Sequence, residues 1–384
     1  MRRVYLDNGS TSFPKAPGVG QAMFEYIENA GFNVSRGGYR SSYDLAERIL
    51  DTREKLRDFF GFDRESNVIF TPNVTFSLNY VIHGLLNAGD GLVISSMEHN
   101  AVARPVETAK RKGVHLRIAQ CDEKGRLDLD QFEEQIRYDD TKAVVMLHGS
   151  NVCGSLMPVA EVGKICKDRD IFFIVDAAQT AGVFPIHMKE MNINGLAFTG
   201  HKGLLGPQGI GGLLLDESLA EEISPIIDGG TGSRSDSVVM PEFLPDKLEP
   251  GTLNLPGIIG LSAALDYVAE KGVDAIRAEE LKLARLFMSA LEGRDDVRVV
   301  GPPAEEERCP IVSLDFLNMD NAEVAFRLDE EFGIMTRCGL HCAPLAHRTL
   351  KTFPQGTVRF AFGHKNTVEE VEYAIDAIER ILRD

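Results

Sequence analysis

The sequence lacks features that would point to a membrane or to nucleic acid. No apolar run reaches the ~18 residues that a spanning helix needs, and the first ten residues, MRRVYLDNGS, contain no apolar stretch typical of a secretory signal. Positive charge is scarce, because 41 Lys and Arg stand against 58 Asp and Glu and give a net charge of −17. Such a chain repels phosphate backbones and anionic lipids. We therefore expect a cytoplasmic protein that binds neither nucleic acid nor membranes.

Cysteine is scarce as well. Six cysteines in 384 residues, at irregular spacing, do not form the pattern of a disulfide framework, so most should be reduced. Cys342 lies in the irregular segment TRCGLHCAP beside Arg337 and His341, an electropositive setting that favours a reactive thiolate. The common alternative is an inert, buried thiol. A zinc site with Cys338 lacks a second convincing pair of ligands, and we expect no metal.

The order of apolar segments predicts the fold. From about Asn67 onward, short apolar runs such as LVISS and IFFIVDAA alternate with helix-length segments such as 101–112, which favours an α/β fold with a mostly parallel mixed sheet flanked by helices. Two helical stretches, 258–270 and 274–291, then lead into strand-like VRVV, IVSLDF and TVRFAF. We predict a large domain over 15–257 and a smaller α+β domain made of 1–14 and 258–384.

Polar residues follow the predicted strands, where open parallel sheets bind ligands. Lys202, in the Gly-rich segment TGHKGLLGPQG, does not fit a phosphate-binding loop and is better interpreted as a Schiff-base lysine than as a solvated one. Asp176 ends the apolar strand IFFIV, where a carboxylate needs a cationic partner such as a protonated pyridine ring, although it could also cap the next helix. Gln179 could bind the same ring or complete that cap.

Other strand ends supply further candidates. Thr75 opens a helix whose first amides could bind a phosphate, together with Thr199 and His201, although a threonine there is more often only a cap. The imidazole of His99 could stack on a planar cofactor, and Asn151 could hydrogen-bond near it. In strand-like TVRFAF, Arg359 needs an anionic partner, which is either a substrate carboxylate or a local Asp or Glu.

Together these segments resemble the NifS/SufS branch of the class V aminotransferases, which are fold-type I enzymes dependent on pyridoxal 5′-phosphate. The resemblance runs from YLDNGSTSFPKAP to VRFAFGHKNT and is carried by SSMEHN, HGSNVCG, VDAAQ, FTGHKGLLGPQG, EPGTLN and RCGLHCAP. The short segment around Cys342 is more similar to the SufS-type subgroup. Tyr39 stands where many SufS-like members have histidine, and HKNT replaces a more common aromatic-Asn-Thr ending.

The resemblance implies a role for each candidate. Lys202 would bind the cofactor covalently, Asp176 its pyridine nitrogen and Gln179 its phenolic oxygen, while Cys342 would receive sulfur from cysteine as a persulfide. The resemblance also implies that His99 stacks on the cofactor. The phosphate would be bound by Val74, Thr75, Thr199 and His201 and, across the interface of a homodimer, by Thr252. The substrate would be bound by Asn151, Arg359 and Tyr39.

The resemblance therefore predicts a pyridoxal-phosphate-dependent cysteine desulfurase that converts L-cysteine to L-alanine. Two other functions stay open: a selenocysteine lyase or other C–S lyase of the same family, and a non-catalytic sulfur-relay or scaffold protein. The acceptor of the sulfur is a further partner, either a protein or a small thiol. Nothing in the sequence identifies a pathway such as iron–sulfur cluster assembly.

Overall fold

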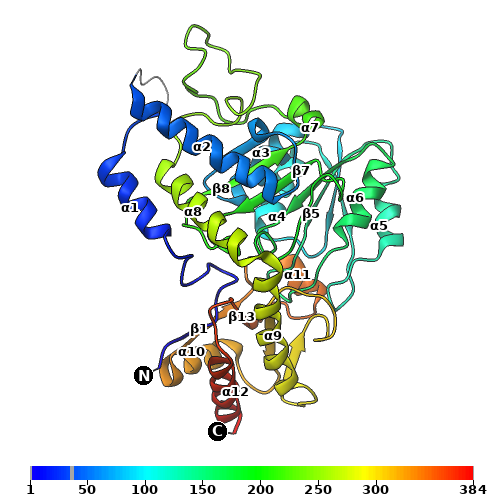
Figure 1. Cartoon of the computed structure of the whole chain (residues 1–384). Coiled ribbons are helices and arrows are strands. Elements are labelled where there is room, and N and C mark those ends of the chain that lie inside the picture. Colours follow the sequence, from blue (N-terminus) through cyan, green and yellow to red (C-terminus); the bar gives the residue numbers. More distant parts are fainter. Residues whose placement is uncertain (1, 35–38, 384) are drawn as a thin grey trace.

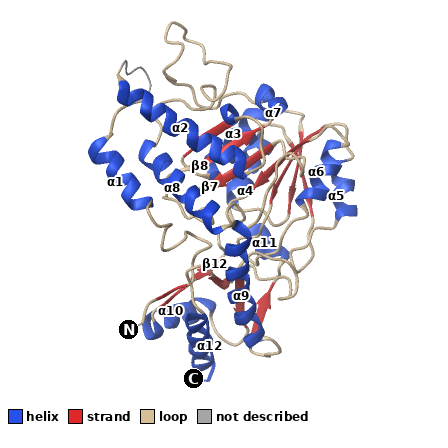
Figure 2. Ribbon diagram, in the orientation of Figure 1, coloured by secondary structure: helices blue, strands red, loops and turns tan. Residues whose placement is uncertain are grey.

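The structure is a computed structural model that describes residues 2–34 and 39–383. Within these residues the strands form three sheets, and the largest has helices on both faces (Figure 1) (Figure 2). This arrangement confirms the predicted α/β fold. The large sheet has the strand order β2-β8-β7-β6-β5-β3-β4. Its strands are β2 (Val68–Thr71), β3 (Gly91–Ser95), β4 (His115–Ala119), β5 (Thr141–Leu147), β6 (Phe172–Asp176), β7 (Gly195–Thr199) and β8 (Gly211–Leu215).

Strand direction in the large sheet brings the candidate residues to one edge. Only β8 runs antiparallel to its neighbours β2 and β7, and every other pair is parallel. Six of the seven strands therefore end at the same edge. Side chains alternate between the two faces, so that Val93 and Phe173 belong to one core while Leu92 and Ile174 belong to the other.

The helices divide between these two cores. One face is covered by α2 (Arg40–Phe59), α5 (Leu129–Ile136), α6 (Val159–Lys167) and α8 (Leu255–Lys271), with α1 (Val19–Asn29) packed on α8. The other face is covered by α3 (Val74–Leu85), α4 (Asn100–Arg111) and α7 (Glu217–Glu222). A short 3₁₀ helix, Glu65–Asn67, leads into β2.

Both chain ends lie in the part of the molecule that holds the smaller sheets (Figure 1). The four-stranded sheet is antiparallel in the order β12-β13-β10-β9, and β1 pairs with β11. Its core packs between α9, α10 and α12. The bounds are β1 (Val4–Tyr5), α9 (Val273–Leu291), β9 (Val297–Val300), β10 (Ile311–Phe316), α10 (Asn321–Phe332), β11 (Ile334–Met335), β12 (Arg337–Gly339), α11 (Pro344–Thr349), β13 (Thr357–Ala361) and α12 (Val368–Arg383).

The predicted elements of this part, two helices and three strands, are present as α8, α9, β9, β10 and β13. The domain boundary predicted after residue 257 falls inside α8, whose residues Ile258, Leu261 and Leu265 pack in the core of the large sheet. We therefore propose that the large domain continues to the end of α8. The N-terminal segment joins the smaller part, since β1 pairs with β11 and Asp7 bridges to Ala361.

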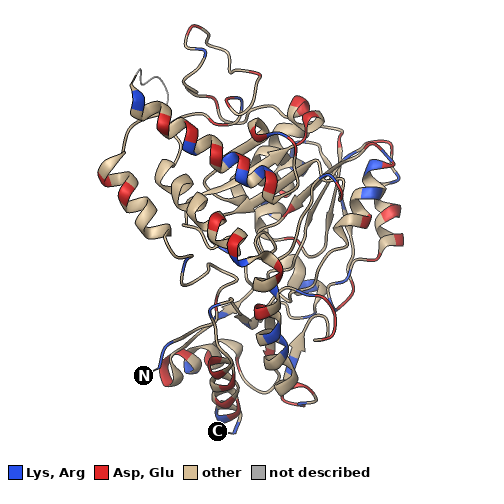
Figure 3. Cartoon of the chain, viewed as in Figure 1, with Lys and Arg blue, Asp and Glu red and all other residues tan. Residues whose placement is uncertain are grey.

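Charged residues are frequent along helices such as α2 and α12 (Figure 3). None of the helices in the described ranges combines the length and the apolar character that would let it cross a lipid bilayer. Among the few buried charged groups, Glu98, Asp176 and Arg359 belong to the site described next.

Candidate active site at the carboxyl ends of the strands

The candidate residues converge at the carboxyl edge of the large sheet. Asp176 is the last residue of β6 and Thr199 the last of β7, while Asn151 follows β5 and His99 caps α4 just after β3. Lys202 follows β7 by three residues. The parallel direction of these strands explains the convergence, which the sequence predicted.

Lys202 occupies a tight loop and is partly buried. Its carbonyl accepts a hydrogen bond from the amide of Leu205 at 2.8 Å. Burial, with a smaller contribution from the nearby cation of Arg359, lowers the pKa of Lys202 to about 8, against the opposing effect of the Asp176 carboxylate. Such an amine is more readily neutral, and hence nucleophilic, than a surface lysine.

Asp176 is 4% exposed, and its Oδ1 accepts the Ala178 amide at 2.9 Å. Burial raises the pKa of this carboxyl, while the Ala178 hydrogen bond and the charge of Lys202 lower it. Gln179 is also buried and donates its side-chain amide to the carbonyl of Gly9 at 3.0 Å. An acid and an amide donor therefore lie on one short turn close to the lysine.

His99 is held as a neutral imidazole. Its Nδ1 accepts the amide of Ala101 at 3.0 Å, which caps α4 and leaves the proton on Nε2. Burial lowers its pKa to about 4, and the cations of Lys202 and Arg337 add to this effect. A flat, uncharged ring thus faces the same cluster of charges.

Several polar atoms at the site are buried without a hydrogen-bond partner among the described residues. They are Oγ1 of Thr199, Nδ1 of His201, Oδ1 of Asn151 and Nε of Arg359. Burying an unpaired polar atom costs free energy unless a ligand satisfies it. Threonine and histidine together suit a phosphate, the guanidinium suits a carboxylate, and the amide oxygen of Asn151, which can only accept, suits a donor such as an amine. The residues present therefore fit an anionic, planar cofactor bound to Lys202.

The start of α3 lies at the same edge. Asn73 caps this helix by accepting the amides of Thr75 and Phe76, so the cap role that sequence reasoning considered for Thr75 belongs to Asn73. Val74 is buried and Thr75 is exposed in the first helical turn. The Thr75 hydroxyl and the positive end of the helix dipole therefore lie at this edge, where the amides of Thr75 and Phe76 already bind the Asn73 cap.

Cys342 is exposed and sits in a strained turn. Two consecutive non-glycine residues have left-handed backbones, with φ of 48° at His341 and 58° at Cys342. The carbonyl of Cys342 accepts the amide of Asn100 at 2.7 Å, which joins this turn to the start of α4 beside His99. Arg337 lies 3.5 Å from the sulfur through one guanidinium nitrogen.

Cys338 is separated from this thiol by strand geometry. It lies on β12 between Arg337 and Gly339, and alternation turns it toward the core of the smaller sheets, against which it packs. Burial raises the pKa of Cys338. Within residues 2–34 and 39–383, no three His, Cys, Asp or Glu side chains gather as metal ligands.

Arg359 has a local acid as its partner. It is 1% exposed, and its Nη2 contacts the Asp7 carboxylate at 2.7 Å and the Ser10 hydroxyl at 2.7 Å. Its Nη1 donates to the carbonyl of Asn151 at 2.9 Å. Arg337 also contacts Ser10, at 3.0 Å, and in the described part of the chain no carboxylate pairs with it. One carboxylate thus faces two guanidinium groups, which leaves positive charge for a ligand.

Sequence reasoning missed Asp7, Ser10 and Glu98. Glu98 is fully buried beneath the site, where its Oε1 accepts the Ser95 hydroxyl at 2.5 Å and the Leu147 amide at 3.1 Å, while Oε2 has no partner in the described chain. Burial raises its pKa to about 8, and the charge of Asp176 adds to the effect. Glu98 directly precedes His99 at the end of an apolar strand, and this is the sequence feature that could have identified it.

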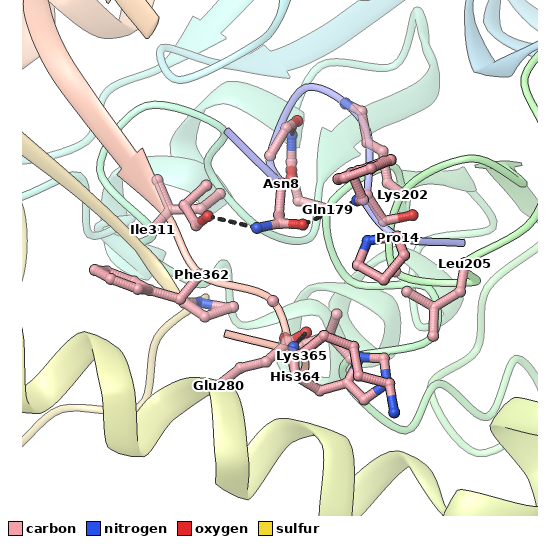
Figure 4. Close-up of a pocket in the computed structure, with 18 residues that line it drawn as sticks. Asn8, Pro14, Gln179, Lys202, Leu205, Glu280, Ile311, Phe362, His364 and Lys365 are labelled. Carbon is pink, nitrogen blue, oxygen red and sulfur yellow. Dashed lines mark hydrogen bonds between the residues drawn. The ribbon is translucent and has the colours of Figure 1, made fainter. Parts of the chain in front are cut away.

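A small cavity adjoins the site between the two parts of the molecule. Figure 4 shows Lys202 and Gln179 on one side of it and Glu280 and Phe362 on the other. Oε1 of Glu280 accepts the amide of His364 at 3.0 Å, and burial raises the pKa of this glutamate to about 8.

Two predicted site residues lie elsewhere. Tyr39 is 46% exposed, caps α2 and meets Phe32 edge to face with ring centroids 5.8 Å apart. Thr252 is exposed and lines a separate cavity with Phe76 and Ile227. The structure gives neither residue a contact with Lys202 within this chain.

Fold and site together define a class of protein. The chain matches the family of class-V aminotransferases from residue 4 to residue 374, and it belongs to that family. Relatives include a probable cysteine desulfurase of Methanothermobacter thermautotrophicus, 33% identical over 98% of this chain and 94% of that protein. The cysteine desulfurase of Haloferax volcanii is 33% identical over 98% of this chain and 88% of its own length.

Solved structures give the same result. The apo cysteine desulfurase of Thermococcus onnurineus has a TM-score of 0.92 and 33% identity, covering 99% of this chain and 95% of that one. A cysteine desulfurase of Escherichia coli has a TM-score of 0.89 and 28% identity, covering 99% and 95%. These matches confirm the resemblance found in the motifs. Assignment to the SufS-type subgroup stays a prediction.

Proposed function

We propose that this protein is a pyridoxal-phosphate-dependent cysteine desulfurase, which converts L-cysteine to L-alanine and keeps the sulfur as a persulfide on Cys342. The observation that carries the proposal is the position of that thiol. It is exposed, contacts Arg337 and is joined through Asn100 to the helix that presents His99 to the Lys202 cluster. The names of the full-length relatives support the same activity.

The cofactor would be bound by groups with matching chemistry. Lys202 would hold it covalently, Asp176 would pair with its ring nitrogen, Gln179 would bind its phenolic oxygen, and the neutral ring of His99 would stack on it. Its phosphate would meet the buried unpaired atoms of Thr199 and His201 and the helix start at Val74 and Thr75. When bound, the cofactor supplies an electron sink that labilises bonds at the substrate α-carbon.

The chain's own groups would do the rest. Asn151 and Arg359 would hold the substrate: Arg359 would donate from its unpaired Nε to the substrate carboxylate, and the unpaired Oδ1 of Asn151 would accept a hydrogen bond from a donor such as the substrate amine. The amine of Lys202, once free, would take the proton from the substrate α-carbon. The Cys342 thiolate would then attack the substrate sulfur, so that the Sγ–S bond forms as the Cβ–S bond breaks. The products are alanine and a persulfide on Cys342.

We also propose that the working enzyme is a homodimer. Thr252 lines a cavity that does not include Lys202, and large apolar side chains are exposed near it, including Phe76 at 43% and Ile227 at 41%. A second copy that covered this surface would bring Thr252 to the phosphate of the neighbouring site and bury apolar area. Tyr39 would contribute to substrate binding in the same assembly.

The test is turnover of L-cysteine by the purified holoprotein. We expect alanine to form and mass spectrometry to find one additional sulfur on the peptide that contains Cys342. Lys202→Ala should abolish both signals, Cys342→Ala should abolish sulfur release from cysteine, and Cys338→Ala should leave both signals intact.

Two outcomes would redirect the proposal. Continued cleavage of selenocysteine by Cys342→Ala, with no activity on cysteine, would favour a selenocysteine lyase. Absence of any chromophore bound to Lys202, and of alanine, would favour a sulfur-relay or scaffold role. Adding candidate acceptor proteins or small thiols to the persulfide form would then show which partner removes the sulfur.

A further inference from the structure

The N-terminal segment 9–16 crosses the loop that carries Lys202, and most of its hydrogen bonds to the loop converge on one atom. That atom is the carbonyl oxygen of His201, the residue directly before the lysine. It accepts the Ser12 amide at 2.9 Å and the Lys15 ammonium at 2.8 Å, with the hydroxyls of Thr11 and Ser12 at 3.2 and 3.1 Å. So many donors on one carbonyl indicate a built anchor point.

The ammonium of Lys15 is committed to this anchor. Besides the His201 carbonyl, it donates to the Thr11 hydroxyl at 3.0 Å and to the Ser12 hydroxyl at 3.2 Å, which uses all three of its protons. In the part of the chain that the structure describes, no carboxylate forms an ion pair with it. Burial lowers the pKa of Lys15 to about 8, which means that keeping this amine charged in its buried position costs free energy.

The anchor holds one side of the lysine loop, and a second contact holds the other. The amide of Ala16 donates to the carbonyl of Leu205 at 2.9 Å, and the Leu205 amide donates back to the carbonyl of Lys202 at 2.8 Å. The segment 12–16 therefore brackets the residues from His201 to Leu205. Because the His201 carbonyl belongs to the peptide unit that leads into Lys202, restraint of this oxygen restrains the direction of the lysine backbone.

We propose that Lys15 is a positioning residue for Lys202, which fixes the His201–Lys202 peptide so that the lysine side chain meets the cofactor. The inference rests on the proposed function for its consequence, since it assumes that Lys202 binds the cofactor. The geometric part, restraint of the loop, does not depend on it. Lys15 contacts neither substrate nor reacting atoms and acts only through the peptide that it binds.

The variant that tests this is Lys15→Met, which keeps the apolar stem and removes the donors. Lys15→Arg restores a charged donor, and Lys55→Met is the matched control. Lys55 is another partly buried lysine, but it pairs with Asp51 and Asp266 between α2 and α8, away from the loop. For each protein, hydrogen exchange is measured in the cofactor-free form for peptides covering 201–206, and the cofactor dissociation constant is measured from its visible absorbance.

We expect Lys15→Met to exchange faster in 201–206 and to bind the cofactor roughly tenfold or more weakly, as loss of a charge-assisted hydrogen bond implies. Turnover at saturating cofactor should fall much less. Lys15→Arg should recover most of the affinity, and Lys55→Met should match the wild type in both measurements. If Lys15→Met does not fold, Ser12→Ala should show the same two changes at smaller size.

Unchanged exchange and affinity in Lys15→Met would overturn the proposal. So would a loss of affinity that Lys55→Met shares or that Lys15→Arg fails to recover, because that pattern belongs to general destabilisation. Failure of the proposed function has a different signature: the wild type itself would bind no cofactor at Lys202, while hydrogen exchange would still report whether Lys15 restrains the loop.

Discussion

Replacing Glu98 with glutamine should remove a pH-dependent loss of stability that the wild-type protein carries. Glu98 is fully buried, and its Oε1 is satisfied by the Ser95 hydroxyl and the Leu147 amide while Oε2 has no partner in the described chain. The acid of Asp176 faces it from the end of β6, and the Cys121 thiol also lies within electrostatic range. Glutamine keeps the accepting oxygen and cannot ionise.

The raised pKa of Glu98 makes its contribution to stability fall as the pH rises. Burial raises the pKa of Glu98 from 4.5 in the unfolded chain to about 8 in the folded protein, so its contribution to stability is fully present below pH 4.5 and is lost as the pH rises toward 8. The difference between these two pKa values corresponds to at most ~5 kcal/mol of unfolding free energy, and most of this stability is lost between pH 5 and pH 8. Glu280, whose pKa burial also raises to about 8, adds a separate loss over the same range.

The assay is urea unfolding of cofactor-free wild type and Glu98→Gln at several pH values between 5 and 9. At pH 5 the two proteins should agree within about 1 kcal/mol, and by pH 8 the variant should be more stable by several kcal/mol. Glu107→Gln, which changes an exposed carboxylate on α4, should show no such pH-dependent gain in stability over the wild type. A difference between Glu98→Gln and wild type that is constant over this range would refute the claim that Glu98 is held neutral.

Three further substitutions test the site and its support. Asp176→Asn should lower desulfurase turnover roughly a hundredfold or more, because the buried charge that would pair with the cofactor is lost; alanine assays that show near-normal turnover would contradict this role. Arg53→Met leaves Glu249 buried without its guanidinium partner and should cost about 3–5 kcal/mol in urea unfolding. A loss below about 1 kcal/mol would be too small for a buried pair. Gly182→Ala should lower the thermal midpoint by several degrees, since φ is 88° and a Cβ would clash with the Gly203 carbonyl; an unchanged midpoint would contradict that strain.

Residues whose positions follow from the local order of strands and loops could be predicted from the sequence. Lys202, Asp176 and Asn151 each follow an apolar strand, and parallel strands end at one edge, so their convergence follows from strand order alone. Cys342 could be singled out because basic residues and a glycine surround it in an irregular segment. The motif resemblance then attached a chemistry to this cluster, which the comparison with known proteins supports.

Residues whose partners are distant in the sequence could not be predicted. Arg359 meets Asp7 across 352 residues, and Lys15 meets the His201 carbonyl across 186, through contacts that no periodicity records. The sequence left open whether the partner of Arg359 is a substrate or a local acid; the structure shows Asp7 as a local partner, and the substrate contact stays a proposal. Nor could the sequence show that Cys338, four residues before Cys342, is turned by strand alternation toward the core of the smaller sheets.

The sequence by itself determined the α/β pattern, the family and the strand-end residues, because each depends on local order along the chain. Only the tertiary structure decided which charged groups lie next to one another. It placed Arg337 and Arg359 around Ser10 with Asp7 paired to Arg359, a buried acid with a raised pKa at position 98, and the N-terminal segment across the lysine loop. These arrangements depend on how separate elements dock, and docking is set by the packing of whole faces rather than by any short run of residues.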